Sequence, residues 1–483
     1  MLRGLGPCGG TGGDSVHTVI LGAGPAGLSA AYELTTRGHS VTVAEQSPYV
    51  GGLARTVVRG QFRFDIGPHR WFTKNQDLND LMRSLLGDQL ILVPRRTRIY
   101  FRGRYFDYPL KPTRALFGMG PAVAVRILAD YAAARLSAGR EAPGSFEEWT
   151  VRQFGRTLYE LYFKSYTEKV WGIPCDSISL DWASQRIRGL SLGSAVPSAV
   201  LKRRMRGKIK SLVDQFMYPA TGAGLTYETM RSAVEVRNQV LTNARVVALG
   251  REGRQVTHAV VETPQGTRNL EGDQFISSIP LTELILSMKP EPPEDVMAAA
   301  RSLRYRDHLV VALMIARPRL TPDTWIYIQE PGLKAARMYE PRNCSPYMVP
   351  SEEMTSLGVE YYCFEGDDFW RKGDDELIDF AIGEVGDRLG FFERREVADG
   401  FVVRSRMAYP LIVKGYQEPL GVLKRWVRSL DNLQIVGRCG TFRYNNQDHA
   451  IQTGLLAARN LMGASYDIDR VNADGEYLEE ARA

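Results

Sequence analysis

The stretch HTVILGAGPAGLSAAYELTTRGHSVTVAEQ, from His17 to Gln46, decides the fold. An apolar run from Val19 to Leu21 predicts a buried strand, and LSAAYELTTRG has the apolar spacing of a helix that ends at Gly38. SVTVAE predicts a second strand, which ends in Glu45. The order of strand, glycine turn, helix, strand and acid is that of a βαβ unit that binds a dinucleotide.

Three glycines, Gly22, Gly24 and Gly27, separate the first strand from the helix in the pattern GxGxxG. Because glycine has no side chain, this turn can approach a pyrophosphate, which then lies at the N-terminus of the helix. Glu45 stands where a carboxylate accepts hydrogen bonds from ribose hydroxyls, and its charge disfavours a 2′-phosphate. The pattern therefore predicts a bound dinucleotide, and a glycine-rich turn without a ligand is the alternative.

Length and composition fit a large two-domain enzyme. The chain has 483 residues, of which 44% are hydrophobic, enough for a sizeable core. Lys and Arg exceed Asp and Glu by 61 − 55 = 6, an excess that suits an anionic ligand but does not predict nucleic-acid binding. The five cysteines are scattered without a CxxC pair, which fits a reducing compartment and predicts neither disulfides nor a metal site.

No transmembrane segment is expected, because no apolar run is long enough to cross a bilayer. Residues 1–16 lack the apolar core of a signal peptide and predict a flexible leader. We therefore expect a cytoplasmic protein. The basic stretch LKRRMRGKIK, residues 201–210, predicts either a solvated face or a docking surface for a phosphate-bearing substrate or an anionic membrane.

The segment after the second strand distinguishes FAD from NAD. GGLARTVVRGQFRFDIGPH begins with Gly51 and Gly52 and passes through Arg55 into an apolar strand. This pattern resembles the FAD-dependent amine oxidase and mutase superfamily. The resemblance implies that the glycine pair and Arg55 lie along the phosphates and ribityl chain of FAD, with a solvated loop charge as the alternative for Arg55.

The far end of the chain supplies a second flavin segment. Residues 432–462 predict a strand, a turn at Gly437 and Arg438, and a helix from about Asp448. In two-domain flavoproteins a late helix returns its N-terminus to the flavin, where its dipole stabilises negative charge. Asn446, Gln447 and Asp448 stand at this N-terminus, so we expect them to contact FAD and the FAD domain to be built from both chain ends.

The fold class is therefore α/β: a Rossmann-like FAD-binding domain with a mixed-sheet substrate domain and a helical segment. The expected boundaries are a leader at 1–16, the FAD domain's first part at 17–110, a helical substrate and mobile-loop segment at 111–215, a return to the FAD domain at 216–285, the substrate-domain sheet at 286–425, the FAD domain's last part at 426–465 and a polar tail at 466–483.

Four stretches resemble the UDP-galactopyranose mutases. GPHRWFTKN (67–75) resembles the segment that carries a flavin-side histidine, and IYFRGRYFDYPL (99–110) resembles the strand pair that follows it. LYELYFKSYTEKVWG (158–172) resembles a helix and mobile loop, and GRCGTFRYNNQDHAI (437–451) resembles the flavin-contacting end. The combination is specific, whereas any one stretch would not be.

The resemblance implies a role for each matched side chain. His69 would lie against the isoalloxazine ring, Arg438 beside the flavin, and Trp171 on the uracil side of the substrate. The resemblance also implies diphosphate or sugar contacts for the remaining residues of the set: Tyr166, Tyr218, Arg337, Tyr409 and Tyr444. Of these, Arg337, Tyr409 and Tyr444 join His69 as the expected catalytic residues. The alternatives are a packing or surface role for Tyr218, Arg337 and Tyr409, a core role for Trp171, and a turn-fixing role for His69.

The activity that the resemblance implies is a mutase reaction, the interconversion of pyranose and furanose forms of a nucleotide-linked sugar. In this family the N5 atom of the reduced flavin attacks the anomeric carbon and displaces the nucleoside diphosphate. Arginines and tyrosine hydroxyls are needed to hold the leaving diphosphate close. A nucleotide sugar and an unidentified reductant for the flavin are the implied partners, and a homodimer is left open.

Three departures from the mutase pattern keep an alternative open. Phe72 stands where the mutases have a second histidine, Leu190 where they have an arginine, and Asn446 where they have an aspartate. The alternative is a FAD-dependent oxidase, dehydrogenase or desaturase of the amine oxidase or protoporphyrinogen oxidase type. A FAD-bearing binding or assembly protein without turnover is the third class.

Overall fold

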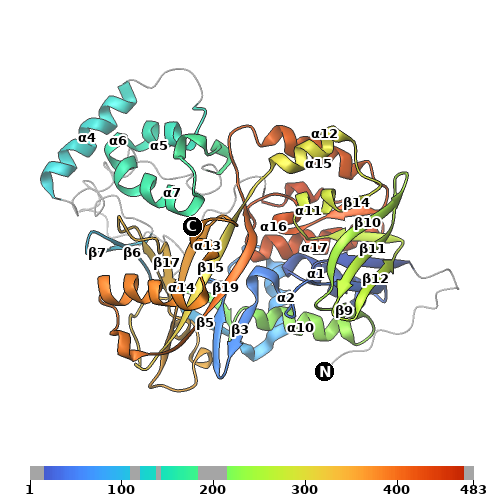
Figure 1. Ribbon diagram of the computed structural model, residues 1–483, viewed down its shortest axis with the longest axis horizontal. Coiled ribbons are helices and arrows are strands. Elements are labelled where there is room, and N and C mark those ends of the chain that lie inside the picture. The colour runs from blue at the N-terminus through green and yellow to red at the C-terminus, as the bar shows by residue number, and fades with distance from the viewer. Residues whose placement is uncertain (1–15, 109–119, 137–142, 183–214, 473–483) are drawn as a thin grey trace.

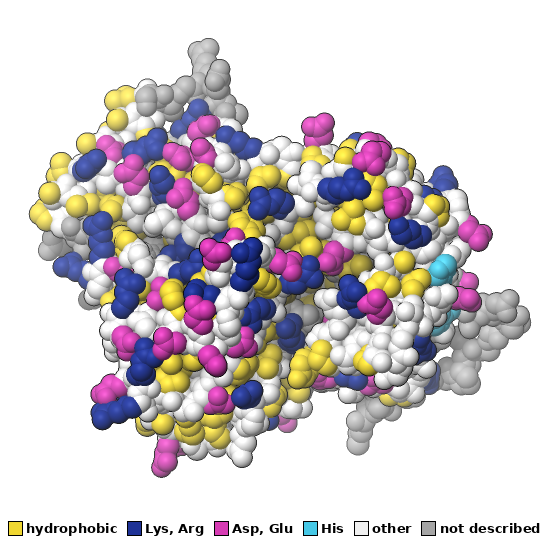
Figure 2. Space-filling model, viewed as in Figure 1, with side chains coloured by type: hydrophobic (Ala, Val, Ile, Leu, Met, Phe, Trp, Pro, Cys, Tyr) yellow, Lys and Arg dark blue, Asp and Glu magenta, His cyan; other side chains and the backbone are white. Residues whose placement is uncertain are grey.

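The structure, a computed structural model, describes residues 16–108, 120–136, 143–182 and 215–472 (Figure 1). The basic stretch 201–210, Leu190, nearly all of the expected leader and most of the expected tail lie outside these residues. No helix in the described part of the chain is both long enough and apolar enough to cross a membrane. On the face shown in Figure 2, acidic and basic side chains are interspersed, in keeping with a formal net charge of only +6.

A parallel five-stranded sheet forms the centre of the dinucleotide-binding half. In spatial order its strands are β20 (Leu433–Ile435), β13 (Gln274–Ser277), β1 (His17–Leu21), β2 (Ser40–Ala44) and β9 (Gln239–Leu241). β1 and β2 are the two strands that the βαβ pattern predicts. Because β20 comes from the far end of the chain, the sheet is assembled from segments that are distant in sequence.

Alternate residues of β1 enter two different cores, as the strand's period of two requires. Ile20 packs into a core formed with α1 (Pro25–Thr36), α2 (Gln76–Leu86), α10 (Gly224–Glu235) and α17 (Gln447–Leu461). Val19 and Leu21 pack on the other face, against a second sheet and three helices. These elements are β10 (Arg245–Glu252), β11 (Gln255–Thr263), β12 (Gly266–Glu271), β14 (Met288–Lys289), α11 (Leu281–Leu286), α12 (Glu294–Ser302) and α15 (Gln417–Arg428).

The two chain ends meet where α1 crosses α17. A Cβ atom on Gly454 would lie 2.0 Å from the carbonyl oxygen of Ala26, so only glycine permits this approach. The hydroxyl of Ser29 on α1 donates to the carbonyl of Ile451 on α17 at 3.0 Å. The late helix thus completes the core of the N-terminal unit.

A mixed seven-stranded sheet forms the second half of the molecule. Its order is β19 (Val397–Pro410), β15 (Tyr305–Ile315), β18 (Thr355–Cys363), β17 (Arg337–Tyr339), β16 (Trp325–Ile328), β6 (Thr97–Phe101) and β7 (Arg104–Asp107). β6 and β7 fall within the boundary expected for the FAD domain, 17–110, but the structure places them here. The reason is that β6 pairs in parallel with β16, a strand more than two hundred residues later.

A helical segment covers one end of this sheet, at the upper left of Figure 1. It contains α4 (Pro121–Leu136), α5 (Phe146–Phe154), α6 (Arg156–Leu158), a π-helical stretch (Tyr159–Lys164) and α7 (Ser165–Trp171). Two further helices, α13 (Asp368–Arg371) and α14 (Asp374–Ala381), pack on the sheet itself. Two antiparallel strand pairs connect the halves: the hairpin of β3 (Thr56–Arg59) with β4 (Phe62–Asp65), and the long-range pair of β5 (Leu90–Pro94) with β8 (Gln215–Pro219).

Candidate functional site: a flavin cradle and a tyrosine–arginine cluster

The glycine turn between β1 and α1 is built for close approach. A Cβ atom on Gly27 would lie 1.9 Å from the carbonyl oxygen of Gly22, and one on Gly52 would lie 3.1 Å from the Cα atom of Gly24. The GxGxxG turn and the Gly51-Gly52 turn therefore face each other without side chains between them. The N-terminus of α1 has proline in its first turn and no side-chain cap, so its N–H groups remain available to an anion.

The acid and the arginine of the cradle are both held by backbone groups. The Glu45 carboxylate accepts from the N–H of Ala23 at 2.8 Å and from that of Ser47 at 2.9 Å. Burial raises the pKa of Glu45, and these hydrogen bonds oppose the rise. Arg55 donates from Nη1 to the carbonyl of Gly52 at 2.8 Å, and burial lowers the pKa of its guanidinium. Both side chains are thus fixed beside the glycine turns.

The start of α17 is tied to the loop that carries His69. Asn446 caps the helix in a reciprocal pair with His449, and its N–H donates to His449 Nδ1 at 3.3 Å. Gln447 donates to the carbonyl of Arg70 at 2.8 Å and accepts from the hydroxyl of Tyr227 at 2.9 Å. The predicted flavin contacts at the two chain ends are therefore joined in space.

Asp448 lies in the first turn of α17 and is buried. Together with the uncapped glycine turn and the acid at the end of β2, the residues present fit FAD: they offer N–H groups for the pyrophosphate, a carboxylate for a ribose and a helix N-terminus for the flavin end.

His69 is held as a neutral imidazole. Its Nδ1 lies 2.9 Å from the carbonyl of Gly67, which assigns the proton to Nδ1 and leaves Nε2 as an acceptor. Burial, followed by the charges of Arg438 and Arg337, lowers the pKa of His69 to about 4, although the bond to Gly67 and the charge of Glu360 oppose this. The side chain is therefore uncharged at neutral pH.

Arg438 lies against two nearly parallel tyrosine rings. The rings of Tyr409 and Tyr444 are 5.9 Å apart with an interplanar angle of 17°, and the Arg438 Cζ atom lies 4.8 and 4.9 Å from their centroids. The Arg438 guanidinium donates to the carbonyl of Asn445 at 2.8 and 2.6 Å. Since its hydrogen bonds go to backbone carbonyls rather than to a carboxylate, this group keeps a net positive charge.

Arg337, in contrast, is neutralised by a carboxylate that sequence reasoning missed. Its Nε and Nη2 donate to the two carboxylate oxygens of Glu360 at 2.7 and 2.6 Å. His308 Nε2 lies 2.9 Å from the same carboxylate. Burial by itself raises the pKa of Glu360, but the charge of Arg337 and the hydrogen bonds from His308 and Arg337 prevail and lower the pKa to about 2.

A signal for Glu360 and His308 exists in the sequence. Both stand in strands whose residues are all buried, TSLGVEYYC and YRDHLVVALMI. An ionisable residue in a fully buried strand is costly unless it is paired, so each one marks a buried partner.

A second buried carboxyl, Asp65, lies behind the His69 loop. It accepts from the hydroxyl of Thr56 at 2.6 Å, from the hydroxyl of Tyr218 at 2.8 Å and from the N–H of Ala223 at 3.0 Å. Burial raises the pKa of Asp65 to about 6 despite these donors. Asp65, Tyr218 and His69 line one small cavity. The hydroxyl of Tyr218, expected to contact substrate, is thus committed to Asp65.

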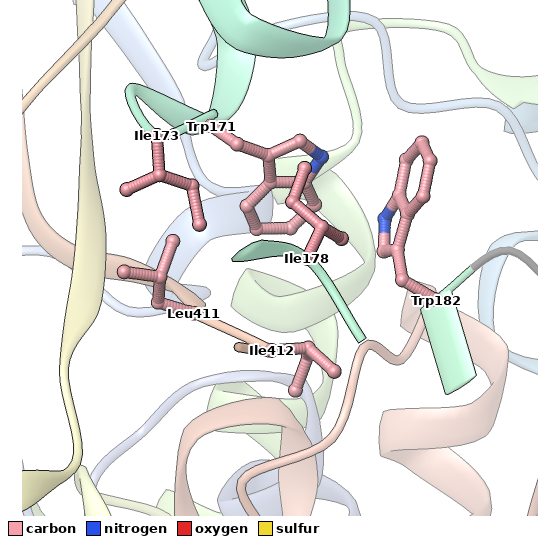
Figure 3. A pocket seen from close by; sticks show the side chains of 6 residues that line it. All are labelled: Trp171, Ile173, Ile178, Trp182, Leu411 and Ile412. Carbon is pink, nitrogen blue, oxygen red and sulfur yellow. The ribbon is translucent and has the colours of Figure 1, made fainter. Parts of the chain in front are cut away.

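The predicted residues of the YTEKVWG loop lie on α7. The Trp171 ring packs edge-on against Trp182 at 5.6 Å and against Tyr409 at 6.4 Å. Figure 3 shows the apolar pocket around it, which is lined by Trp171, Ile173, Ile178, Trp182, Leu411 and Ile412. The Tyr166 ring lies 5.9 Å from Tyr327, over which the Arg337 guanidinium is also placed, at 5.9 Å. The structure therefore brings α7, Arg337 and the tyrosine–arginine cluster together.

A chain with this cradle, closed by a helix from its far end, is an FAD-binding α/β enzyme. It belongs to the flavin containing amine oxidoreductase family, whose model matches residues 25–462.

Short matches link the chain to oxidases and to a mutase. It is 48% identical over 68 residues to the L-amino acid oxidase Cdc18 of Crotalus durissus cumanensis, which is 14% of this chain and 14% of that protein. It is 26% identical over 167 residues to a Klebsiella pneumoniae protein named "Probable UDP-galactopyranose mutase", which is 33% of this chain and 42% of that protein. The aligned part is thus less than half of either relative.

Solved structures match over almost the full chain. The structure of reduced UDP-galactopyranose mutase has a TM-score of 0.81 at 23% identity and covers 95% of this chain and 98% of its own. A putrescine oxidase bound to putrescine has a TM-score of 0.58 at 16% identity, covering 93% and 99%. At these identities the likeness establishes the fold, and the reaction has to be argued from the site.

Proposed function

We propose that the chain is a FAD-dependent mutase that interconverts pyranose and furanose forms of a nucleotide-linked sugar. The observation that carries the proposal is the cluster of Arg438, Tyr409 and Tyr444 within electrostatic reach of His69. A guanidinium with a net charge and two phenol hydroxyls form the donor set that a diphosphate needs. The overall likeness to a mutase structure, with a TM-score of 0.81, supports the same choice.

Each side chain has a task in this reaction. FAD held by the two glycine turns, Glu45 and the start of α17 would, in its reduced form, supply the nucleophile for the anomeric carbon, with the nucleoside diphosphate as the leaving group. Arg438 and the two tyrosines would hold the displaced diphosphate near the sugar, so that the bond can re-form. His69, neutral and with Nε2 as an acceptor, would relay a proton to the ring oxygen, which becomes a hydroxyl as the ring opens, and would take the proton from the different hydroxyl that recloses the ring. Trp171 and Tyr166 would border the nucleotide end, and a cellular reductant would keep the flavin active.

One observation favours the second candidate, a FAD-dependent oxidoreductase. Glu360 neutralises Arg337, the residue that the mutase resemblance assigns to the diphosphate. A site with one charged guanidinium instead of two binds a diphosphate more weakly and suits a less highly charged substrate. The match to an amino acid oxidase points the same way.

Product mass separates the two candidates. The holoenzyme, reduced with dithionite, is incubated with a panel of nucleotide hexoses, and the products are separated by chromatography with mass detection. A mutase gives a new peak of unchanged mass, with reduced enzyme only. A dehydrogenated product that forms with oxidised enzyme in air refutes the mutase and establishes the oxidoreductase.

The variant Tyr444→Phe tests the diphosphate contact within the mutase proposal. Losing a hydrogen bond to a charged group costs about 1.5–3 kcal/mol, so we expect the KM to rise at least about ten-fold with FAD retained. Tyr466→Phe is the matched control, because Tyr466 is 50% exposed. Equal KM values for the two variants would remove Tyr444 from the site.

A further inference from the structure

Helix α4 presents an apolar face to solvent. Of its sixteen residues, only Ala124 and Ile127 are buried. Val125, Leu128 and Leu136 are 67%, 40% and 89% exposed. The remaining exposed apolar positions are small: Pro121, Ala122, Ala129, Ala132 and Ala133. Figure 1 shows α4 at the outer left edge of the molecule, and Figure 2 shows hydrophobic side chains gathered over it.

The charges of α4 are sorted between its two sides. Its one acid, Asp130, faces the protein, where its carboxylate accepts from the N–H of Thr157 at 3.0 Å and from the hydroxyl of the same residue. Its two basic residues, Arg126 and Arg135, are exposed. The outward face is therefore apolar and positive, without a carboxylate of its own.

We propose that the outward face of α4 docks on an anionic lipid surface. A helix that carries apolar residues with arginines beside them lies in the interface plane, its apolar side chains among the acyl chains and its cations on the headgroups. A protein partner fits less well: protein interfaces are enriched in aromatic residues, Met and Arg and depleted in Ala, and the exposed residues of α4 include four alanines, no aromatic residue and no Met.

Docking would hold the substrate side of the molecule at the lipid surface. α4 packs on α5 and α6, and the core that Ile127 enters also contains Trp171 from α7. The helices that border the tyrosine–arginine cluster are therefore one packed unit with the docking face. This surface goes beyond the proposed reaction and does not depend on it.

Vesicle flotation of the full-length holoenzyme tests the surface. We expect the protein to float with vesicles of phosphatidylcholine mixed with phosphatidylglycerol, more weakly as salt is added, and not with phosphatidylcholine alone. The double variant Val125→Asp/Leu128→Asp should bind at least about ten-fold more weakly, since it places charges where acyl chains would be. Arg126→Gln should weaken binding about five-fold, the effect of one basic residue near such a surface.

Val236→Asp is the matched control, because Val236 is 77% exposed but follows α10 on the other half of the molecule. Flavin absorbance verifies that each variant is folded and holds FAD. Absence of flotation at low salt, or equal flotation of the double variant and the control, would overturn the proposal. A third outcome would also overturn it: the wild type is a dimer, the double variant is a monomer, and neither protein binds vesicles. The outward face of α4 would then contact a second copy of the chain. Turnover of nucleotide sugars in solution should be the same for all variants, so this test is independent of the proposed reaction.

Discussion

Two buried carboxyl groups flank the His69 loop, and their surroundings shift their pKa values in opposite directions. Asp65 begins the loop, and Glu360 lies against Gly67 inside it, where a Cβ atom would be 3.1 Å from the Glu360 carboxylate. The pKa of Asp65 is raised to about 6, whereas the pKa of Glu360 is lowered to about 2. Both lose hydration, and both accept hydrogen bonds: Asp65 accepts four from three donor groups, and Glu360 accepts three from two side chains.

The difference lies in the formal charge of the donors. Asp65 is surrounded by two hydroxyls and a backbone N–H, which do not outweigh the loss of hydration. Glu360 faces the guanidinium of Arg337, and the positive charge of this group outweighs the loss of hydration. At these two positions the presence of a cation, and not hydrogen bonding alone, decides whether the pKa of the carboxyl falls below or rises above its ordinary value. On one side of the loop the structure keeps a fixed ion pair, and on the other it keeps a group that can gain or lose a proton near neutrality.

The largest effect should come from removing the cation. Arg337→Met leaves Glu360 buried without its partner, and such a change costs about 3–5 kcal/mol of the free energy of unfolding. Denaturant unfolding near neutral pH measures it. Arg245→Met is the control, because Arg245 and Glu262 form an exposed ion pair whose loss costs about 1 kcal/mol or less. If both variants lose the same stability, Glu360 does not depend on Arg337. The double variant Arg337→Met/Glu360→Met should recover most of the loss.

A second test uses the opposite sign of the Asp65 shift. Because the folded state holds this proton more tightly than the unfolded state, Asp65 stabilises the fold below about pH 4 and loses that contribution as pH rises through about 6. Asp65→Asn cannot ionise. The free energy of unfolding of the variant minus that of the wild type should therefore rise by about 2 kcal/mol between pH 4 and pH 7.

Only the difference between the two proteins shows this effect. The pKa of His69 is lowered to about 4, so the unfolded state binds its proton more tightly and stability rises with pH over about the same range. In the wild type the two slopes oppose each other. A difference that is flat from pH 4 to pH 7 would mean that Asp65 is ionised throughout.

The smallest effect should follow Tyr218→Phe, which removes one neutral donor from Asp65. The loss should be about 1 kcal/mol, and larger at pH 8 than at pH 4, because the hydrogen bond is stronger to the ionised carboxylate. Tyr347→Phe serves as the control, since Tyr347 is 59% exposed. A loss that is independent of pH would show that the protonation state of Asp65 is the same at both values.

The cradle and the far ends of the chain could be predicted because their signals are local. These signals are glycines at fixed spacing, the start of the helix that follows them and an acid at the end of a strand. Each can be recognised from residues that are near neighbours in the sequence. The family model and the fold confirm the flavin, and Gln447 forms hydrogen bonds with Arg70 and Tyr227, whereas its contact with FAD stays a prediction.

The Glu360 pair could not be predicted in the same way. Glu360 is in β18, and its partners His308 and Arg337 come from β15 and β17. Strand register decides which residues face each other: Arg337 lies opposite Glu360, and His308 lies opposite Tyr362, two residues after Glu360. Register is not local information. The same limit explains β6 and β7, whose sheet is set by a parallel pairing with β16.

The closing of the dinucleotide-binding core by α17 also has a consequence for synthesis. Roughly four hundred residues separate β1 from β20, so a ribosome adding about 5–20 residues per second needs roughly 20–80 s to deliver the last strand after the first. During that interval the face of α1 around Ala26 and Ser29 lacks the helix that will cover it. For about a minute this face of α1 is therefore open to contacts with neighbouring chains, and the first motif to be synthesised is the last to complete its core.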